Sequence, residues 1–337
     1  MTTQPVAAPT RMALSAWSAL GVVYVLWGST YLAIRYTIAS MPPMLSAAAR
    51  FSLAGLIALA AVRLVRGRAA MRASRTELGT AAASGLLLLV GGNGLVVFGE
   101  QRVASGLAAL LVACVPLWVV VLRVLLRDRP AGVTLAGVLV GLVGVGTLLL
   151  PGGGRGAGDV GYAALLVLAG LSWSAGSLLT TRRPVPGDPF LLTAVQMLVA
   201  GVGLLVLAVA RGELRGFSLG QVTDKSWLAL GYLVVFGSLI GFTAYVWVLG
   251  RAPVSVVSTY AYVNPAVAVL LGVLVAGERL TGGELVGGLV ILVAVALVVS
   301  AEGTRSRRAR EGRGDPPEGV LGAPRDLGRL GPGVADG

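Results

Sequence analysis

Long apolar runs separated by short polar gaps dominate the chain from about residue 15 to residue 300. Each run is close to the roughly 20 apolar residues that an α-helix needs to cross the hydrocarbon core of a bilayer. The pattern predicts ten transmembrane helices, at residues 15–35, 44–65, 78–99, 104–126, 132–150, 159–181, 189–210, 227–249, 254–276 and 283–300. We therefore predict an all-α membrane protein.

Composition supports a membrane protein and excludes several classes of function. Hydrophobic residues make up 56% of the 337 residues and charged residues only 12%, which is too apolar for a soluble chain. The chain contains no histidine, so it lacks histidine metal sites and Ser-His-Asp triads. The single cysteine, Cys114, lies in an apolar run and is expected to serve packing. We expect no enzyme activity, no cofactor and no metal.

The basic residues indicate topology rather than nucleic-acid binding, although the net charge is +12. They fall mostly in alternate gaps between the apolar runs, with a cluster from Arg63 to Arg75 and more arginines after residue 301. Because Lys and Arg collect on the cytoplasmic side, we predict a multi-pass protein of the cell inner (plasma) membrane with both termini cytoplasmic. Residues 1–14 would form a cytoplasmic tail, and residues 301–337, rich in Gly, Pro and Arg, a disordered basic cytoplasmic tail.

The second half of the chain repeats the first at a nearly constant offset. Trp27 matches Trp173 and Pro43 matches Pro189 at a shift of 146, while Ser105 matches Ser255 at 150 and Pro116 matches Pro265 at 149. We predict one five-helix repeat at residues 15–150 and another at 159–300, joined by a linker at 151–158. Since five is odd, the second repeat enters the membrane from the opposite side, and such inverted repeats are typical of alternating-access carriers.

Two prolines interrupt apolar runs at matching places. Pro116 lies in the middle of run 104–126, and Pro265 lies in the middle of run 254–276. A proline inside a helix removes one backbone hydrogen bond and bends the helix. We predict that both prolines bend their helices, the alternative being an inherited packing feature.

Polar and aromatic residues within the spans are the candidate substrate site, because polar groups inside a membrane are costly and usually functional. The predicted substrate-binding residues are Trp27, Ser29, Thr30, Arg50, Asn93, Trp173, Ser177, Tyr245, Tyr260, Tyr262 and Asn264. For any single tryptophan, packing in the helix core is an equally good explanation.

Arg50 and Glu100 are the candidates for coupling or gating. Arg50 lies about 10 Å below the outer surface at 1.5 Å per residue, and Glu100 at the end of its run has a comparable depth. We expect the two to pair in an external vestibule; the alternative is that Arg50 snorkels to the headgroups. With no histidine available, Glu100 is also the expected proton site if protons drive transport.

Three groups of motifs stand out along the chain. They are WGSTYLAIR at residues 27–35, the GNG, EQ and SGLAALL elements at residues 92–111, and STYAYVNPAVAVLLG with GERLTGG at residues 258–283. Together these motifs resemble the EamA family of the drug/metabolite transporter superfamily. The resemblance implies ten helices in two inverted repeats and the export of amino acids or other small metabolites or drugs. RDRPAG at residues 127–132 departs from the family's usual GERLS-type turn.

The function predicted from these features is secondary transport. No GxxxxGK[ST] motif for ATP binding is present, and no filter-like repeat indicates a channel. The alternative is a channel or facilitative exchanger for small polar solutes without ion coupling. The expected partners are a small-molecule substrate, the lipid bilayer and, as a hypothesis, protons; no nucleic acid is expected, and the protein would be a monomer or a homodimer.

Overall fold

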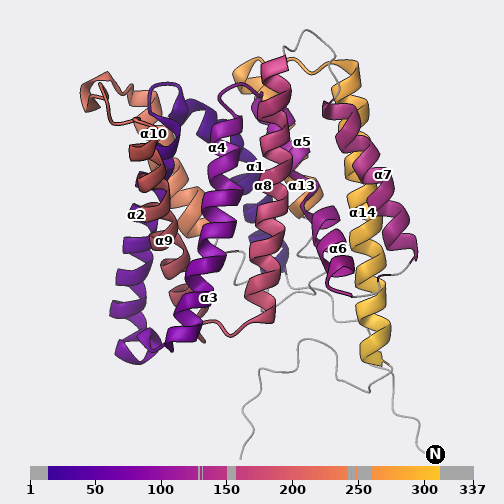
Figure 1. Ribbon diagram of the computed structural model, residues 1–337, viewed down its shortest axis with the longest axis horizontal. Helices are drawn as coiled ribbons and strands as arrows, with labels where there is room; N and C mark the ends of the chain where they lie inside the picture. Colours follow the sequence, from indigo (N-terminus) through magenta and orange to yellow (C-terminus); the bar gives the residue numbers. More distant parts are fainter. Residues whose placement is uncertain are drawn as a thin grey trace, which may run out of the picture.

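The computed structural model describes residues 14–127, 130, 132–149, 157–241, 244, 248 and 260–311. Within those residues all regular secondary structure is helical. Figure 1 shows the helices side by side in one bundle, with most of their axes running from one end of the bundle to the other. The predicted all-α class is therefore confirmed.

The helices of the first half follow the predicted apolar runs. They are α1 (Leu14–Ile38), α2 (Pro43–Ala61), α3 (Arg75–Gly85), α4 (Leu95–Gly99), α5 (Ser105–Val112), α6 (Val115–Leu125) and α7 (Gly132–Leu149). Two π-helical segments, Val62–Arg66 and Leu86–Gly94, and a short 3-10 turn at Arg68–Met71 connect or extend them. The segment Leu86–Gly94 joins α3 and α4 into one span from Arg75 to Gly99.

The second half contains α8 (Ala157–Arg182), α9 (Pro189–Ala210), α10 (Asp224–Tyr232), α13 (Tyr260–Ala276) and α14 (Gly282–Glu311). A π-helical segment at Leu233–Ile240 continues α10, and a 3-10 turn lies at Leu219–Gln221. Asp188 begins α9 by accepting hydrogen bonds from the N–H groups of Phe190 and Leu191, which would otherwise have no partner in the helix.

Seven helices among the described residues are long and apolar enough to cross a membrane. Two shorter apolar helices, Gly132–Leu148 and Val263–Ala276, accompany them. Large apolar side chains lie on the outside of the bundle, such as Val202 on α9 and Leu274 on α13, as expected where lipid is the solvent. The chain is a multi-pass membrane protein; the predicted number of ten spans stays a prediction, because parts of the eighth and ninth lie outside the described residues.

Two helix boundaries differ from those predicted. The run 104–126 forms two helices, because the helix is interrupted at Ala113 and Cys114. Helix α6 then begins with Pro116 in its first turn, where a proline loses no hydrogen bond. The other helix, α14, continues to Glu311. The prediction that disorder begins at residue 301 was therefore wrong for residues 301–311, whose Ala, Glu and Arg favour a helix.

Contacts between the two halves occur in matched sets. Helix α2 packs on α9 and α7 packs on α14, which joins equivalent helices of the two predicted repeats. In addition, α1 packs on α13 while α8 packs on α5 and α6, and α1 packs on α10 while α8 packs on α3. Likewise α1 contacts Leu233–Ile240 while α8 contacts Leu86–Gly94. If each helix is replaced by its equivalent in the other half, the first contact of every pair becomes the second. An internal two-fold axis produces this pattern.

Candidate functional site

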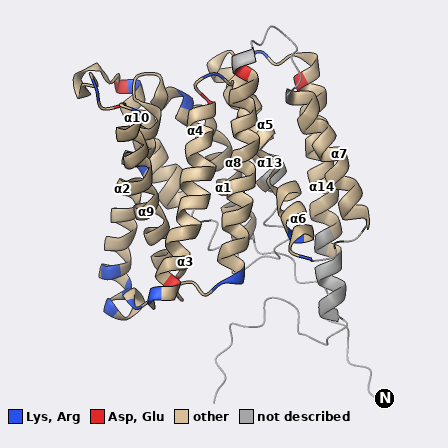
Figure 2. Ribbon diagram, in the orientation of Figure 1, with Lys and Arg blue, Asp and Glu red and all other residues tan. Residues whose placement is uncertain are grey.

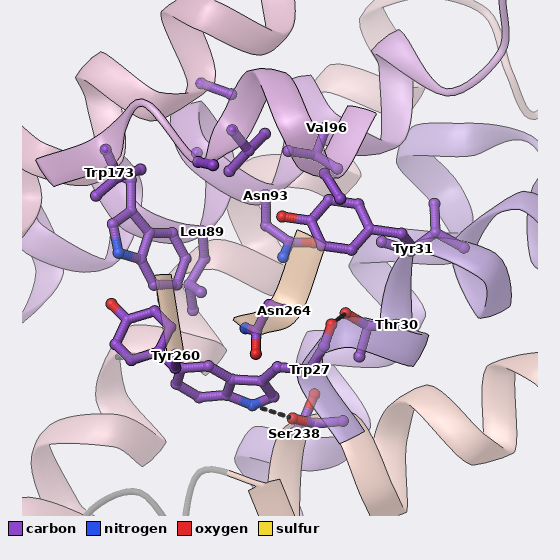
Figure 3. A pocket seen from close by; sticks show the side chains of 18 of the residues that line it. Trp27, Thr30, Tyr31, Leu89, Asn93, Val96, Trp173, Ser238, Tyr260 and Asn264 are labelled. Atoms are coloured by element: carbon purple, nitrogen blue, oxygen red, sulfur yellow. Dashed lines mark hydrogen bonds between the residues drawn. The ribbon is translucent and has the colours of Figure 1, made fainter. Parts of the chain in front are cut away.

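A cavity of about 160 Å³ lies between helices from both halves of the chain. Figure 3 shows aromatic and polar side chains from α1, α8 and α13 facing one another across it. The segments Leu86–Gly94 and Leu233–Ile240 also contribute to its wall, as do α2, α5 and α9. The cavity is the natural candidate for a substrate site, because ligand sites in helical bundles form between helices.

Arg50 on α2 provides the positive charge of the cavity. Arg50 is only 5% exposed. Its Nε donates a hydrogen bond to Ser238 Oγ at 3.1 Å, and its Nη1 donates one to Asn93 Oδ1 at 3.4 Å. Both acceptors are neutral, and no carboxylate of the described residues lies within ion-pair distance. A buried cation without an anionic partner is costly, so Arg50 is a functional candidate rather than a snorkelling side chain.

The two acceptors of Arg50 come from matching π-helical segments. Asn93 belongs to Leu86–Gly94 and Ser238 to Leu233–Ile240. Single π-helical stretches inside α-helices are rare and occur often at functional sites. Here they place a polar side chain from each half of the chain beside the same guanidinium.

Aromatic side chains form part of the cavity wall. The Trp27 and Tyr260 rings meet edge to face, with centroids 5.4 Å apart, and Trp27 Nε1 donates to the carbonyl of Gly237 at 3.2 Å. Trp173 faces the same space (Figure 3). Asn264 also lines the cavity, and its buried Oδ1 has no hydrogen-bond partner in the described part of the chain.

The cavity brings together most of the substrate-binding residues predicted from the sequence. Trp27, Thr30, Arg50, Asn93, Trp173, Tyr260 and Asn264 all line it, together with Pro265. Two predicted residues lie elsewhere: Ser29 bonds to the Tyr232 hydroxyl at 2.6 Å, and Ser177 donates to the carbonyl of Trp173 at 2.8 Å. Tyr245 and the side chain of Tyr262 are outside the described residues. Tyr31, Phe51 and Ser238 line the cavity but were missed.

Pro116 and Pro265 differ in their effect on the helix. Pro116 follows a complete interruption between α5 and α6, whereas α13 continues as a helix through Pro265. Pro265 therefore does not interrupt its helix, and the bend expected there stays a prediction.

The comparison with protein families decides the identity of the chain. The model of the EamA-like transporter family matches residues 15–150 and again residues 161–300. The chain belongs to the EamA-like transporter family.

Relatives of this EamA-like transporter extend over nearly its whole length. It is 38% identical over 290 residues to the "Uncharacterized inner membrane transporter YedA" of Escherichia coli strain K12, covering 86% of this chain and 92% of YedA. It is 28% identical to a WAT1-related chloroplastic protein of Arabidopsis thaliana, covering 85% of this chain and 70% of that protein. A crystal structure that is 22% identical shares the fold, with a TM-score of 0.59 over 88% of this chain and 98% of the other.

Glu100 does not form the predicted ion pair with Arg50 in this EamA-like transporter. Its side chain is buried outside the cavity lining, and neither carboxylate oxygen has a hydrogen-bond partner among the described residues. The charges that act on it are those of Glu278, Arg35 and Arg50. Tyr31, which lines the cavity, lies near Glu100.

Glu278, in the segment between α13 and α14, holds three parts of the chain together. Its carboxylate forms an ion pair with Arg35 of α1 and accepts hydrogen bonds from the N–H and Oγ of Ser105 and the N–H of Gly106, at the start of α5. Burial acts to raise the pKa of Glu278, but the hydrogen bonds and the Arg35 charge outweigh it, so the pKa lies below its ordinary value of 4.5. Arg35 is thus the ion-pair partner of a buried carboxylate.

Proposed function

We propose that this EamA-like transporter carries a small organic solute across the cell inner membrane by alternating access, with the cavity around Arg50 as the substrate site. The observation that carries the proposal is that both halves of the chain line one cavity with polar side chains: Asn93 comes from the first half, and Ser238 and Asn264 from the second. A relative movement of the halves would then change which end of the cavity is open.

Export is the direction we propose, on the basis of the family resemblance. The candidate substrates are amino acids, other small metabolites and drugs. The matched contacts of α1 with α13 and of α8 with α5 support a mechanism in which two equivalent surfaces separate in turn, as two inverted repeats would allow.

Glu100 is the group that we propose for proton coupling. A buried carboxylate without hydrogen-bond donors is expensive to keep charged, and taking up a proton removes that charge.

Filling the cavity tests the substrate site. Ala113→Leu and Ala169→Leu each add volume at a buried position of the lining, whereas Val202→Leu changes a side chain that is 63% exposed on the outside of α9. Purified variants that remain monodisperse are reconstituted into liposomes loaded with a pool of amino acids and other small metabolites, and exchange of labelled solute is measured. We expect exchange to fall for both cavity variants and to persist for Val202→Leu.

The same assay separates a carrier from a channel. A carrier loaded with unlabelled substrate accumulates labelled substrate against its gradient by counterflow, whereas a channel only equilibrates it. Wild-type rates in both well-folded cavity variants, or equilibration without counterflow, would contradict the proposal.

A further inference from the structure

We infer that the cavity selects organic monoanions that combine one aromatic ring with a carboxylate, in preference to zwitterionic amino acids. The inference rests on the proposed function and narrows it to a substrate class. It depends on the charge balance of the cavity, on the free hydrogen-bonding capacity of Arg50 and Asn264, and on the size and aromatic character of the walls.

The charge balance is one-sided. Arg50 is the only charged residue among the described residues that line the cavity. Its two hydrogen-bond partners, Asn93 and Ser238, are neutral, and Glu100 lies outside the lining. A bound monoanion would pair directly with Arg50, whereas a zwitterion would bring a second cation into a cavity whose described lining holds no carboxylate to pair with it.

Arg50 has donors to spare for a carboxylate. A guanidinium carries more N–H groups than the two bonds to Ser238 and Asn93 use. These two bonds fix the plane of the guanidinium, and a planar guanidinium can bind both oxygens of a carboxylate at once. A carboxylate is therefore a better match than a point anion.

The whole cavity is about the size of a one-ring molecule. The volume of about 160 Å³ is similar to that of an engineered apolar cavity of about 150 Å³ that binds benzene. Trp27, Tyr260, Trp173 and Phe51 provide aromatic surface around it, and aromatic rings pack well against one another edge to face or offset.

Asn264 favours a hydrogen-bond donor on the aromatic ring of the substrate. Its buried Oδ1 has no hydrogen-bond partner among the described residues, so it can accept a hydrogen bond from the substrate. A neutral hydroxyl or ring N–H satisfies this acceptor without bringing charge. The aromatic faces could attract an ammonium group, but no carboxylate in the described lining would neutralise it.

Three molecules that share one ring test the inference. 3-(4-Hydroxyphenyl)propionate carries only the carboxylate, tyrosine carries both charges, and tyramine carries only the ammonium. In counterflow with wild-type protein in liposomes, we expect the propionate to be exchanged at least about tenfold faster than tyrosine, a factor that matches a modest difference in binding energy, and tyramine not to be exchanged.

Substitutions test whether Arg50 and Asn264 are responsible for the selectivity for aromatic monoanions. Arg50→Gln is expected to abolish exchange of the propionate, and Arg50→Lys, which keeps the charge but not the planar fork, to reduce it. Arg63→Gln, an exposed arginine beyond α2, is the matched control and is expected to keep wild-type exchange. Asn264→Leu is expected to slow the hydroxylated propionate several-fold while leaving 3-phenylpropionate, which lacks the hydroxyl, unchanged.

The outcomes separate this inference from the proposed function. Faster exchange of tyrosine than of the propionate, or full exchange by well-folded Arg50→Gln and Arg50→Lys protein, would overturn the monoanion selectivity and leave a carrier. Exchange of an unrelated solute with none of the three aromatic molecules would do the same. The absence of counterflow with every solute of the wider metabolite pool would overturn both.

Discussion

Replacing Glu278 with Gln isolates the contribution of one buried carboxylate that joins α1, α5 and the segment before α14. The side chain is 3% exposed. The Oε1 oxygen accepts a hydrogen bond from the N–H of Ser105 and forms the ion pair with Arg35, and Oε2 accepts a hydrogen bond from the N–H of Gly106 at 3.0 Å. Glutamine keeps one oxygen, but its NH₂ group cannot accept the Gly106 hydrogen bond.

The size of the effect follows from these contacts. A buried N–H left without an acceptor costs about 1–3 kcal/mol, and loss of a negative charge at the start of a helix costs about 0.3–1 kcal/mol. The ion pair adds less than about 1 kcal/mol, because the Arg35 side chain is 41% exposed. We expect Glu278→Gln to lower the free energy of unfolding by about 2–4 kcal/mol.

Unfolding in mixed micelles, followed by tryptophan fluorescence, measures the loss. The control is Glu77→Gln, which removes the same charge from the exposed capping box that Glu77 forms with Ser74 at the start of α3; there water can replace the lost partner, so a smaller effect is expected. Equal stability of wild type and Glu278→Gln, or an equal loss in the control, would refute the reasoning.

The pH dependence provides a second check on Glu278. Its pKa in the folded protein is lower than its ordinary value of 4.5, so the charged form stabilises the fold. That contribution is fully present above the ordinary pKa and is lost as the pH falls through the lower folded value. The stability difference between wild type and Glu278→Gln should therefore shrink in acid below 4.5 and stay constant above it.

Three further predictions concern other parts of the chain. Glu100→Gln is expected to abolish the pH dependence of counterflow, and a pH profile like that of wild type would exclude Glu100 as the proton site. Asp188→Ala, which removes the N-cap of α9, is expected to lower the free energy of unfolding by about 1 kcal/mol; an unchanged value would mean that the cap is dispensable. Gly28→Ala would place a Cβ 2.9 Å from the Asn264 carbonyl oxygen and should destabilise by about 1–3 kcal/mol, whereas Gly21→Ala on the same helix meets no atom within 4 Å and should be tolerated; equal behaviour of the two would contradict the packing of α1 on α13.

The sequence predicted correctly those features that depend on whether a side chain prefers lipid or a polar environment. Apolar runs long enough to span a bilayer became helices, and polar residues inside those runs, such as Arg50, Asn93 and Asn264, line the cavity. Lipid cannot satisfy such groups, so they must face the interior of the bundle. The near-constant offset between the halves likewise predicted which helices match, as the paired contacts of α2 with α9 and of α7 with α14 illustrate.

The incorrect predictions concern which side of a helix a side chain lies on, because the rotation of a helix about its axis is set by packing. Arg50 and Glu100 have similar predicted depths, but depth does not fix the direction in which a side chain leaves its helix, and only Arg50 lines the cavity. Ser29 adjoins Thr30 in sequence, yet one residue along a helix turns the side chain by about 100°, and only Thr30 lines the cavity.

Other features had little signal in the sequence. The π-helical segments that place Asn93 and Ser238 beside Arg50 follow from tertiary packing. Glu278 lies in the gap between two predicted helices, and the glycine-rich GERLTGG motif around it does not reveal that its carboxylate is buried. Its partners Arg35 and Ser105 are far away in the sequence and required the structure.

The central claim, that two five-helix repeats lie in opposite orientations, is tested most directly by labelling the equivalent loops after α2 and after α9. Ala69→Cys and Ser218→Cys place single cysteines at exposed positions of these loops, in a Cys114→Ala background that removes the only native thiol. A membrane-impermeant maleimide is applied to intact cells and to permeabilised cells. We expect Ser218→Cys to react in both and Ala69→Cys to react only after permeabilisation; labelling of both positions from the same side would contradict the inverted arrangement.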